Sequence, residues 1–413
     1  MTYRQWPARR RLGALAAPLL LMAAALAALG PAAGATTVAP AAAAASCHNL
    51  TGIQPPSPGT TRNELTAVAV ISACNTWAVG RQASGGDDQT LTEHWNGSAW
   101  KVVPSPNPGT SFNELNSVRG RSASDVWAVG DATDSTKTKT LVLHWNGHTW
   151  KQVPSPSPGA SFNVLTGVRT VSAHEAWAVG FSGSKTTTRP LILHWNGTKW
   201  STSPTPKVEP FSLLNGVAAS SSTDVWAVGG GNVVSGPRQG PAARAHPHPA
   251  VAAVASPSLI LHWNGHTWKR VPAPSPGTSF SELMAVGARS ATSAWAVGES
   301  ESGSSVRTLI LRWNGHTWAK VASPNPGGAT AGDGLSGVTA PAANTAWAVG
   351  FSNRKTLILG WNGHSWAAVP SPNLGSELTF LAAVAASSPS NAWAVGDFEN
   401  TGGPSQALAL HCC

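Results

Sequence analysis

Residues 126–153 read VWAVGDATDSTKTKTLVLHWNGHTWKQV, and the two signatures in this stretch recur along the chain. A fixed period of this kind is typical of repeat architectures. The tetrapeptide Trp-Ala-Val-Gly occurs seven times, beginning at Trp77, Trp127, Trp177, Trp226, Trp295, Trp347 and Trp393. The tripeptide Trp-Asn-Gly occurs six times, each with another tryptophan five residues after its first, beginning at Trp95, Trp145, Trp195, Trp263, Trp313 and Trp361.

Each repeat contains four short apolar runs separated by turn residues, here called A to D. In the second repeat they are A (115–118), B (126–129), C (141–145) and D (150–153). Asn146-Gly147 between C and D predicts a hairpin, because both residues tolerate the positive φ of a type I′ turn. Parallel β-helix coils are much shorter than this period, and two-helix repeats need a helical periodicity that is absent here. The sequence therefore predicts an all-β, seven-bladed β-propeller with four antiparallel strands per blade.

The two ends of the repeat array complement each other. The seventh repeat stops after its C run, 408–411, and lacks a D run. Aligning the first Pro-rich segment, 56–59, with the later ones puts Leu50 at the second hairpin tryptophan and Cys47 at the hairpin glycine. We therefore expect the N-terminal strand to complete the last blade, which leaves no exposed sheet edge.

The expected pairing of the four cysteines follows from this closure of the ring. Cys47 is expected beside Cys412 and Cys413, where a disulfide is natural in an exported protein. Cys74, in the A–B turn of the first repeat, is expected to pair with the remaining cysteine of the C-terminal pair. A lipid anchor on Cys47 is the alternative reading of that residue.

The N-terminus has the layout of an export signal. Residues 1–11 are basic, 12–29 are uncharged and rich in Leu and Ala, and small residues lead to Ala33-Gly34-Ala35. We predict a signal peptide over 1–35, with an uncleaved membrane anchor as the alternative. A flexible leader is expected over 36–46 and the propeller over 47–413, in a secreted, extracellular, monomeric protein.

Composition restricts the possible functions. The formal charge of +9 falls to +5 without the arginines of 1–11, and the remainder is spread over all repeats, so no nucleic-acid partner is expected. Every tryptophan after Trp6 occupies a repeat position, which indicates packing between blades rather than stacking on sugars. The histidines next to the hairpins recur on successive blades and diverge around the ring, so they are expected to support hairpins and not to bind metal. No cofactor is expected.

The tandem Trp-Ala-Val-Gly and His-Trp-Asn-Gly units resemble those of secreted bacterial seven-bladed propeller repeat proteins, within the kelch- and sialidase-like superfold. The resemblance covers 47–413. The segment 147–150 also resembles the end of the sialidase Asp-box, although Trp145 stands where that box has its aspartate. Sialidases and the kelch-type galactose oxidases both use a tyrosine, and Tyr3 is the sole tyrosine of this chain. The resemblance thus implies the fold and excludes both of these activities in the mature protein.

Positions that differ between blades are the candidates for binding, because packing does not dictate them. We expect them around one mouth of the central channel, on the face formed by the B–C and D–A loops. They are Arg81, Asp131, Glu299 and Asp397 after Val-Gly, Glu64, Glu114, Glu282 and Asp333 before strand A, and His246 and His248 in a longer loop of the fourth repeat, 230–258. This face is predicted to bind a glycan or a protein at the cell surface. The alternatives are a polysaccharide lyase or hydrolase with carboxylates at the mouth, and a purely structural surface protein.

Overall fold

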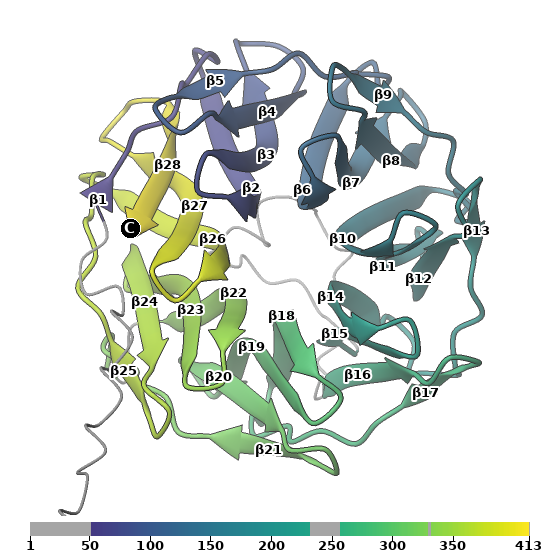
Figure 1. Cartoon of the computed structure of the whole chain (residues 1–413), viewed down its shortest axis with the longest axis vertical. Coiled ribbons are helices and arrows are strands. Elements are labelled where there is room, and N and C mark those ends of the chain that lie inside the picture. The colour runs from purple at the N-terminus through teal and green to yellow at the C-terminus, as the bar shows by residue number, and fades with distance from the viewer. Residues whose placement is uncertain (1–50, 232–256, 329–331, 413) are drawn as a thin grey trace, which may run out of the picture. The chain divides into compact units, whose positions relative to one another are not determined.

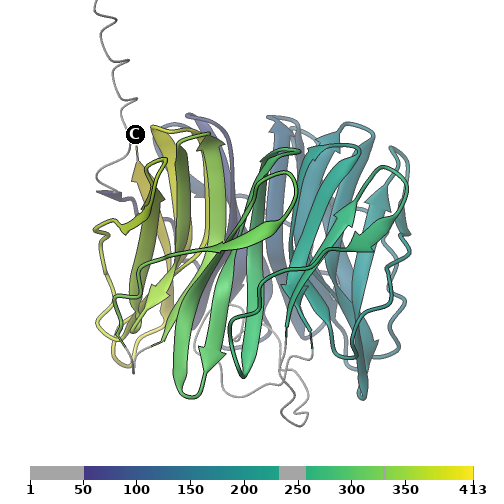
Figure 2. The ribbon, with the colours of Figure 1, turned by 90° about the horizontal axis from the view of Figure 1, so that it is seen from below.

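The computed structural model describes residues 51–231, 257–328 and 332–412. These residues form seven four-stranded antiparallel sheets, arranged as the blades of a ring (Figure 1). The strands run between the two faces of the ring, as the side view shows (Figure 2). In this part of the chain there is no helix with the length and apolarity needed to cross a membrane. The prediction of an all-β, seven-bladed β-propeller is confirmed.

Each blade runs from an inner strand A to an outer strand D. Blade one contains β2 (Arg62–Ser72), β3 (Asn75–Ala83), β4 (Gln89–Trp95) and β5 (Trp100–Val102). Blade two contains β6 (Phe112–Ser122), β7 (Asp125–Thr133), β8 (Thr138–Trp145) and β9 (Trp150–Gln152), and blade three β10 (Phe162–Ser172), β11 (Glu175–Ser184), β12 (Thr187–Trp195) and β13 (Trp200–Thr202). Blade four contains β14 (Leu213–Ser221), β15 (Asp224–Gly230), β16 (Ser258–Trp263) and β17 (Trp268–Arg270), and blade five β18 (Phe280–Ser290), β19 (Ser293–Ser302), β20 (Ser305–Trp313) and β21 (Trp318–Val321). Blade six contains β22 (Asp333–Ala342), β23 (Thr345–Ser352), β24 (Lys355–Trp361) and β25 (Trp366–Ala368), and blade seven β26 (Leu378–Ser388), β27 (Asn391–Glu399), β28 (Ser405–Cys412) and β1 (Thr51–Gly52).

The hairpin between strands C and D is confirmed, but the predicted turn type is wrong. In blade two, Trp145 pairs with Trp150, so the loop holds four residues rather than two. Gly147 has a φ of 96°, whereas Asn146 is not among the residues with positive φ. Asn146 instead caps the loop, because its side-chain oxygen accepts hydrogen bonds from the backbone N–H groups of His148 and Thr149, both at 3.0 Å.

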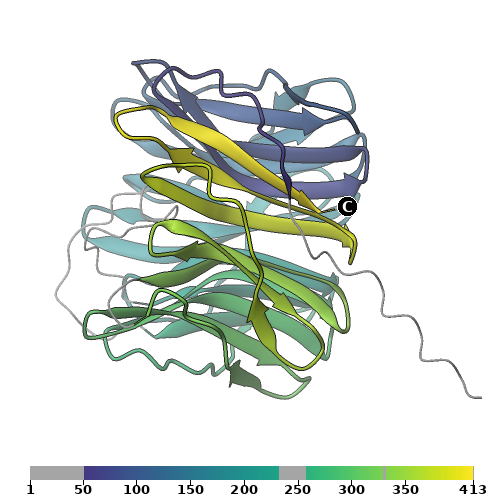
Figure 3. The ribbon, with the colours of Figure 1, turned by 90° about the vertical axis from the view of Figure 1, so that its left-hand side faces the viewer.

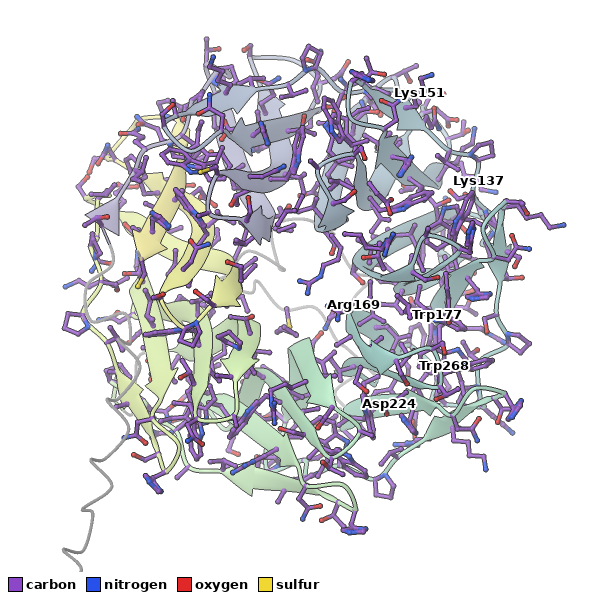
Figure 4. All side chains as sticks on the ribbon, viewed as in Figure 1. Lys137, Lys151, Arg169, Trp177, Asp224 and Trp268 are labelled. Carbon is purple, nitrogen blue, oxygen red and sulfur yellow. The ribbon has the colours of Figure 1, made fainter. Side chains whose placement is uncertain are left out.

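Tryptophans join successive blades. Trp177 of blade three lies 4.9 Å from Trp263 and 5.3 Å from Trp268 of blade four, between ring centroids (Figure 4). The same contact recurs at five other interfaces, and every B-strand tryptophan is at most 5% exposed. Where blade seven lacks a hairpin tryptophan, Cys412 packs near Trp347. The prediction that the tryptophans pack blades together is confirmed.

Histidines support the hairpins, as predicted. His144 lies over Trp127 of its own blade, with the ring centroids 4.3 Å apart, and its Nε2 is 3.0 Å from Oδ1 of Asp125. His94, His194, His262 and His411 make the same ring contact in their blades. In blade five Arg312 takes this place, with its guanidinium carbon 5.2 Å from the centroid of Trp295.

The N-terminal strand closes the ring. β1 pairs antiparallel with β28, with Thr51 opposite His411 and Gly52 opposite Leu410 (Figures 1 and 3). The N–H of Ile53 extends the pairing by donating to the carbonyl of Ala409 at 3.0 Å. The predicted completion of the last blade by the first strand is confirmed.

The cysteine predictions have mixed outcomes. Cys74 lies in the A–B turn beside Gly97 of the neighbouring C–D turn, but it is exposed and free, so the second bridge predicted for it is wrong. Cys412 is buried and disulfide-bonded. Cys47 and Cys413 lie outside the described residues, so the pairing of Cys47 stays a prediction.

Candidate functional site

The charged residues predicted at the channel mouth lie inside paired strands. Glu64 is opposite Arg81 between β2 and β3, and Glu114 is opposite Asp131 between β6 and β7. All four are at most 8% exposed. The sequence placed them in loops because the apolar runs mark only the centres of the strands, whereas β6 begins at Phe112 and β7 continues to Thr133. These residues are therefore part of the packing between blades, which corrects the prediction of an open ligand face made of them.

Arg81 is the centre of a buried ionic network. Its Nη2 donates to Oε2 of Glu64 at 2.7 Å, and its Nε lies 3.6 Å from Oε1 of Glu114 in blade two. Oδ2 of Asp88 lies 3.8 Å from Nη1 of Arg81, and the Asp88 carboxylate accepts two hydrogen bonds from the half-exposed Arg62. Burial acts to lower the pKa of Arg81, but the charges of Glu114, Glu64 and Asp88 outweigh it and hold that pKa above its usual range. Arg62 and Asp88 were not recognised in the sequence as members of this group.

Two carboxyl groups on blade two have raised pKa values. Burial raises the pKa of Glu114 to about 7, against the opposing charge of Arg81. Burial, together with the charge of Glu114, raises the pKa of Asp131 well above its usual value. Asn116 donates to Oδ1 of Asp131 at 3.2 Å and to the carbonyl of Leu165 in blade three at 3.0 Å. Asn116 thus links the carboxyl group of Asp131 in blade two to the backbone of blade three.

The other predicted residues are spread around the ring. Glu282, 3% exposed, accepts a hydrogen bond from Asn215 of blade four at 3.0 Å. Glu299 of blade five lies against Gly334 of blade six, where an added Cβ would be 2.5 Å from Oε2 of Glu299. Asp333 is fully buried, and its Oδ1 accepts a hydrogen bond from the N–H of Gly327 at 3.1 Å. Asp397 of blade seven is 1% exposed, and His246 and His248 lie outside the described residues.

This burial bears on the enzyme alternative. A glycosidase needs two carboxyl groups that reach the same sugar, whereas Glu114 and Asp131 share one blade and are each 1% exposed. Glu282 and Glu299 are likewise cross-strand partners of one blade. Among the described residues, no group of three or more His, Cys, Asp and Glu side chains could hold a metal ion. Among the described residues, the carboxyl groups of Glu114, Asp131 and Glu282 are therefore buried in the packing of the blades.

The inner strands leave a cavity of about 280 Å³ in the central channel. Each A strand has a bulge one residue after its buried leucine, and the bulged residue lines the cavity. In the first four blades this residue donates a side-chain hydrogen bond to a carbonyl of the next blade; the donors are Thr66, Asn116, Thr166 and Asn215. This chain of bonds fixes the channel wall and leaves the cavity open as a candidate binding space.

Two cationic side chains reach this cavity, and the sequence analysis did not select them. Arg119 of β6 and Arg169 of β10 occupy the same repeat position, and Figure 4 shows Arg169 at the inner edge of the ring. The other blades have Ala69, Ala218, Gly287, Thr339 and Ala385 there. A comparison of the A strands position by position, instead of only at their ends, would have found this pair.

Glu93 was also missed in the sequence analysis. It lies on the face of β4 that packs against blade seven, beside Leu91 and Trp95. Neither carboxylate oxygen has a hydrogen-bond partner, the residue is 0% exposed, and burial raises its pKa to about 8. The six other blades have a fully buried leucine at this position: Leu143, Leu193, Leu261, Leu311, Leu359 and Leu410. A single glutamate among leucines was the signal in the sequence.

The two faces of the ring differ in regularity. Every A–B turn has two residues, and every C–D turn within a continuous hairpin has four. The B–C loops vary: blade one has 84–88, blade two 134–137, blade three 185–186 and blade seven 400–404. In blade six both loop residues, Asn353 and Arg354, have positive φ, at 46° and 66°, which is unusual for arginine. Variation between blades is therefore concentrated on the B–C face.

Comparison with known proteins identifies the fold and no family. No protein-family model and no curated protein matches the chain. Among solved structures, YCF48 bound to D1 peptide aligns with a TM-score of 0.52 at 15% identity, over 88% of this chain and 96% of that one. A GH74 xyloglucanase from Xanthomonas campestris aligns with a TM-score of 0.50 at 11% identity, over 84% of this chain and 53% of that one. The WD40 β-propeller domain of Doa1 gives 0.49 at 11% identity, over 89% and 96%.

Proposed function

We propose that this protein is a secreted binding module that engages a protein or a glycan at the cell surface through its B–C face. The observation that carries the proposal is the contrast between the two faces of the ring. The A–B turns keep one length, and the C–D turns keep one length and the same hydrogen bonds, whereas the B–C loops range from two residues in blades three, five and six to five residues in blades one and seven. Loops that vary on a rigid scaffold are the usual place for recognition.

The buried carboxylates do not form this surface, so the exposed side chains of the B–C loops take their place. In blade three these are Lys185 at the loop tip and Arg189 near the start of β12. In blade six Arg354 is exposed at the loop tip, and its Nε donates to the carbonyl of Glu377 at 3.0 Å. This bond holds the loop of blade six in place without using the terminal nitrogens of Arg354.

A protein ligand is the form of the proposal that the neighbouring folds favour, since one of them is described with a bound peptide. A glycan remains part of the proposal and is separated from a protein by the assay. The likeness lies in the fold alone at these identities, so the binding face is argued from this chain.

Binding to a glycan array and to proteins extracted from cell surfaces tests the proposal. The double variant Lys185→Glu/Arg189→Glu is compared with Lys199→Glu, which lies in the C–D turn of the same blade on the opposite face. We expect the double variant to lose binding about tenfold or more and the control to keep it. Equal binding by both variants would refute the B–C face, and binding to no probe by the wild type would refute the function.

A further inference from the structure

The charged side chains that line the central channel near the A–B face are all positive. Of the described residues that line its cavity, two carry charge, Arg119 and Arg169, and both charges are positive. No aspartate or glutamate belongs to this lining. The lining extends from the bulged residues to Pro341 and Ala386, close to the ends of β22 and β26. The cavity therefore reaches toward the A–B mouth, opposite to the B–C face.

Packing does not require arginine at these positions, because five of the seven blades manage with alanine, glycine or threonine. Arg169 has a partial structural role, since its Nη2 donates to the carbonyl of Ala219 in blade four at 2.9 Å. Its Nε is buried without a hydrogen-bond partner. Arg119 has no hydrogen bond or ion pair with any described residue. Guanidinium N–H groups that have no partner at a cavity wall are available to bind hydrogen-bond acceptors.

The two guanidinium groups also repel each other. Burial, together with the positive charge of Arg169, lowers the pKa of Arg119 to about 9. Removing charge from water without a counter-ion is costly, and an anion between the two groups would offset this cost.

The cavity offers room and a further polar group. A volume of about 280 Å³ holds a polyatomic oxyanion with several waters. The hydroxyl of Ser117 lines it and accepts from the N–H of Val168 at 3.1 Å, which leaves its own proton for donation. Guanidinium groups bind phosphate and sulfate through paired N–H donors, and a doubly charged anion matches two cations.

We propose that Arg119 and Arg169 form a binding site in the channel for a compact doubly charged oxyanion of the phosphate or sulfate type. Arg119 supplies a free guanidinium, Arg169 supplies its unpartnered Nε, and Ser117 supplies a hydroxyl. The site lies on a different part of the ring from the B–C loops and does not depend on the proposed function.

Thermal unfolding and isothermal titration with inorganic phosphate, sulfate and acetate test the site, at ionic strength held constant with chloride. The variants are Arg119→Gln and, as matched control, Arg121→Gln on the same strand, where the arginine is exposed and paired with Asp125 at 2.9 Å. We expect saturable binding of one phosphate or sulfate per wild-type chain, weaker binding of acetate, and a loss of about tenfold or more in Arg119→Gln. The control is expected to bind as the wild type does.

A second readout separates the site from general salt effects. Without oxyanion, Arg119→Gln is expected to unfold at the same temperature as the wild type or higher, because a cation without a partner has been removed. With oxyanion, only the wild type and the control gain stability in a saturable way. A gain that is equal in all three proteins and rises without saturation would overturn the proposal, since it would reflect exclusion of the salt from the protein surface. Absence of binding to the wild type would overturn it as well.

Discussion

Replacing Glu93 by leucine should stabilise the propeller, and the gain should grow with pH. The folded protein keeps the carboxyl protonated up to a pKa of about 8, because the group is 0% exposed between blades one and seven and has no partner. In the unfolded chain the same group ionises near its ordinary pKa of 4.5. Between these values the folded state binds more protons than the unfolded state, so stability falls as pH rises.

The magnitude follows from the width of this window. Each pH unit between 4.5 and 8 removes about 1.4 kcal/mol, so the ionisation costs the wild type about 3 kcal/mol at pH 7. Below pH 4.5 this cost vanishes, and the unpaired neutral carboxyl still costs about 1–3 kcal/mol relative to an apolar side chain. Glu93→Leu is therefore expected to gain about 3 kcal/mol more at pH 8 than at pH 5.

Urea unfolding followed by tryptophan fluorescence at pH 5, 6, 7 and 8 measures this difference. The matched variant Glu93→Gln removes the ionisation without adding apolar packing, so it should share the altered pH profile of Glu93→Leu and lack its gain at pH 5. Comparison with the wild type at each pH is needed, because Glu114, with a pKa raised to about 7, adds a slope of the same sign to all three proteins. An equal gain for Glu93→Leu at pH 5 and pH 8 would refute the reasoning.

Other predictions concern the network, the seam and export. Arg81→Met should lower the free energy of unfolding at pH 7 by about 3–5 kcal/mol, because Glu64 and Glu114 lose their buried cation. The control Arg121→Met, on the surface, should change it by less than about 1 kcal/mol. Equal losses of thermal stability in the two variants would contradict the network. Non-reducing peptide mapping should find Cys47 bonded to Cys412 or Cys413, and a free Cys47 would disprove the seam bridge. N-terminal sequencing of the exported protein should begin after Ala35; an intact segment 1–35 would show that the signal is not removed.

The repeat predicted the structure of a blade because each of its two motifs has a single structural role. A tryptophan that recurs at a fixed spacing indicates packing against a neighbouring blade, and Asn146-Gly147 indicates a hairpin. The order of the strands, the number of blades and the closure of the ring by β1 can therefore be predicted without knowledge of side-chain positions. The turn type did not follow, because Asn146 can satisfy a turn through its side chain as well as through its backbone.

The candidate site was predicted less well for a physical reason. We expected positions that differ between blades to be exposed, but Arg81 of blade one forms ion pairs with Glu64 and with Glu114 of blade two, and all three side chains are buried. Sequence spacing along one blade does not reveal such compensation across two blades. Arg119 and Arg169 were missed because they lie inside strands. The sequence analysis located the strands by their apolar residues and looked for binding residues only in the loops between them.

The tryptophan contacts also make the ring a set of coupled chromophores. At each of six blade interfaces an indole lies 4.8 to 5.4 Å from two indoles of the following blade, counted between ring centroids over the described residues. With Tyr3 as the sole tyrosine, absorption near 280 nm in the propeller comes almost wholly from these indoles. Their transition dipoles are held at fixed angles across the interfaces and not within one blade alone. Circular dichroism in that band therefore reports the separation of blades, even while the strands inside each blade stay paired.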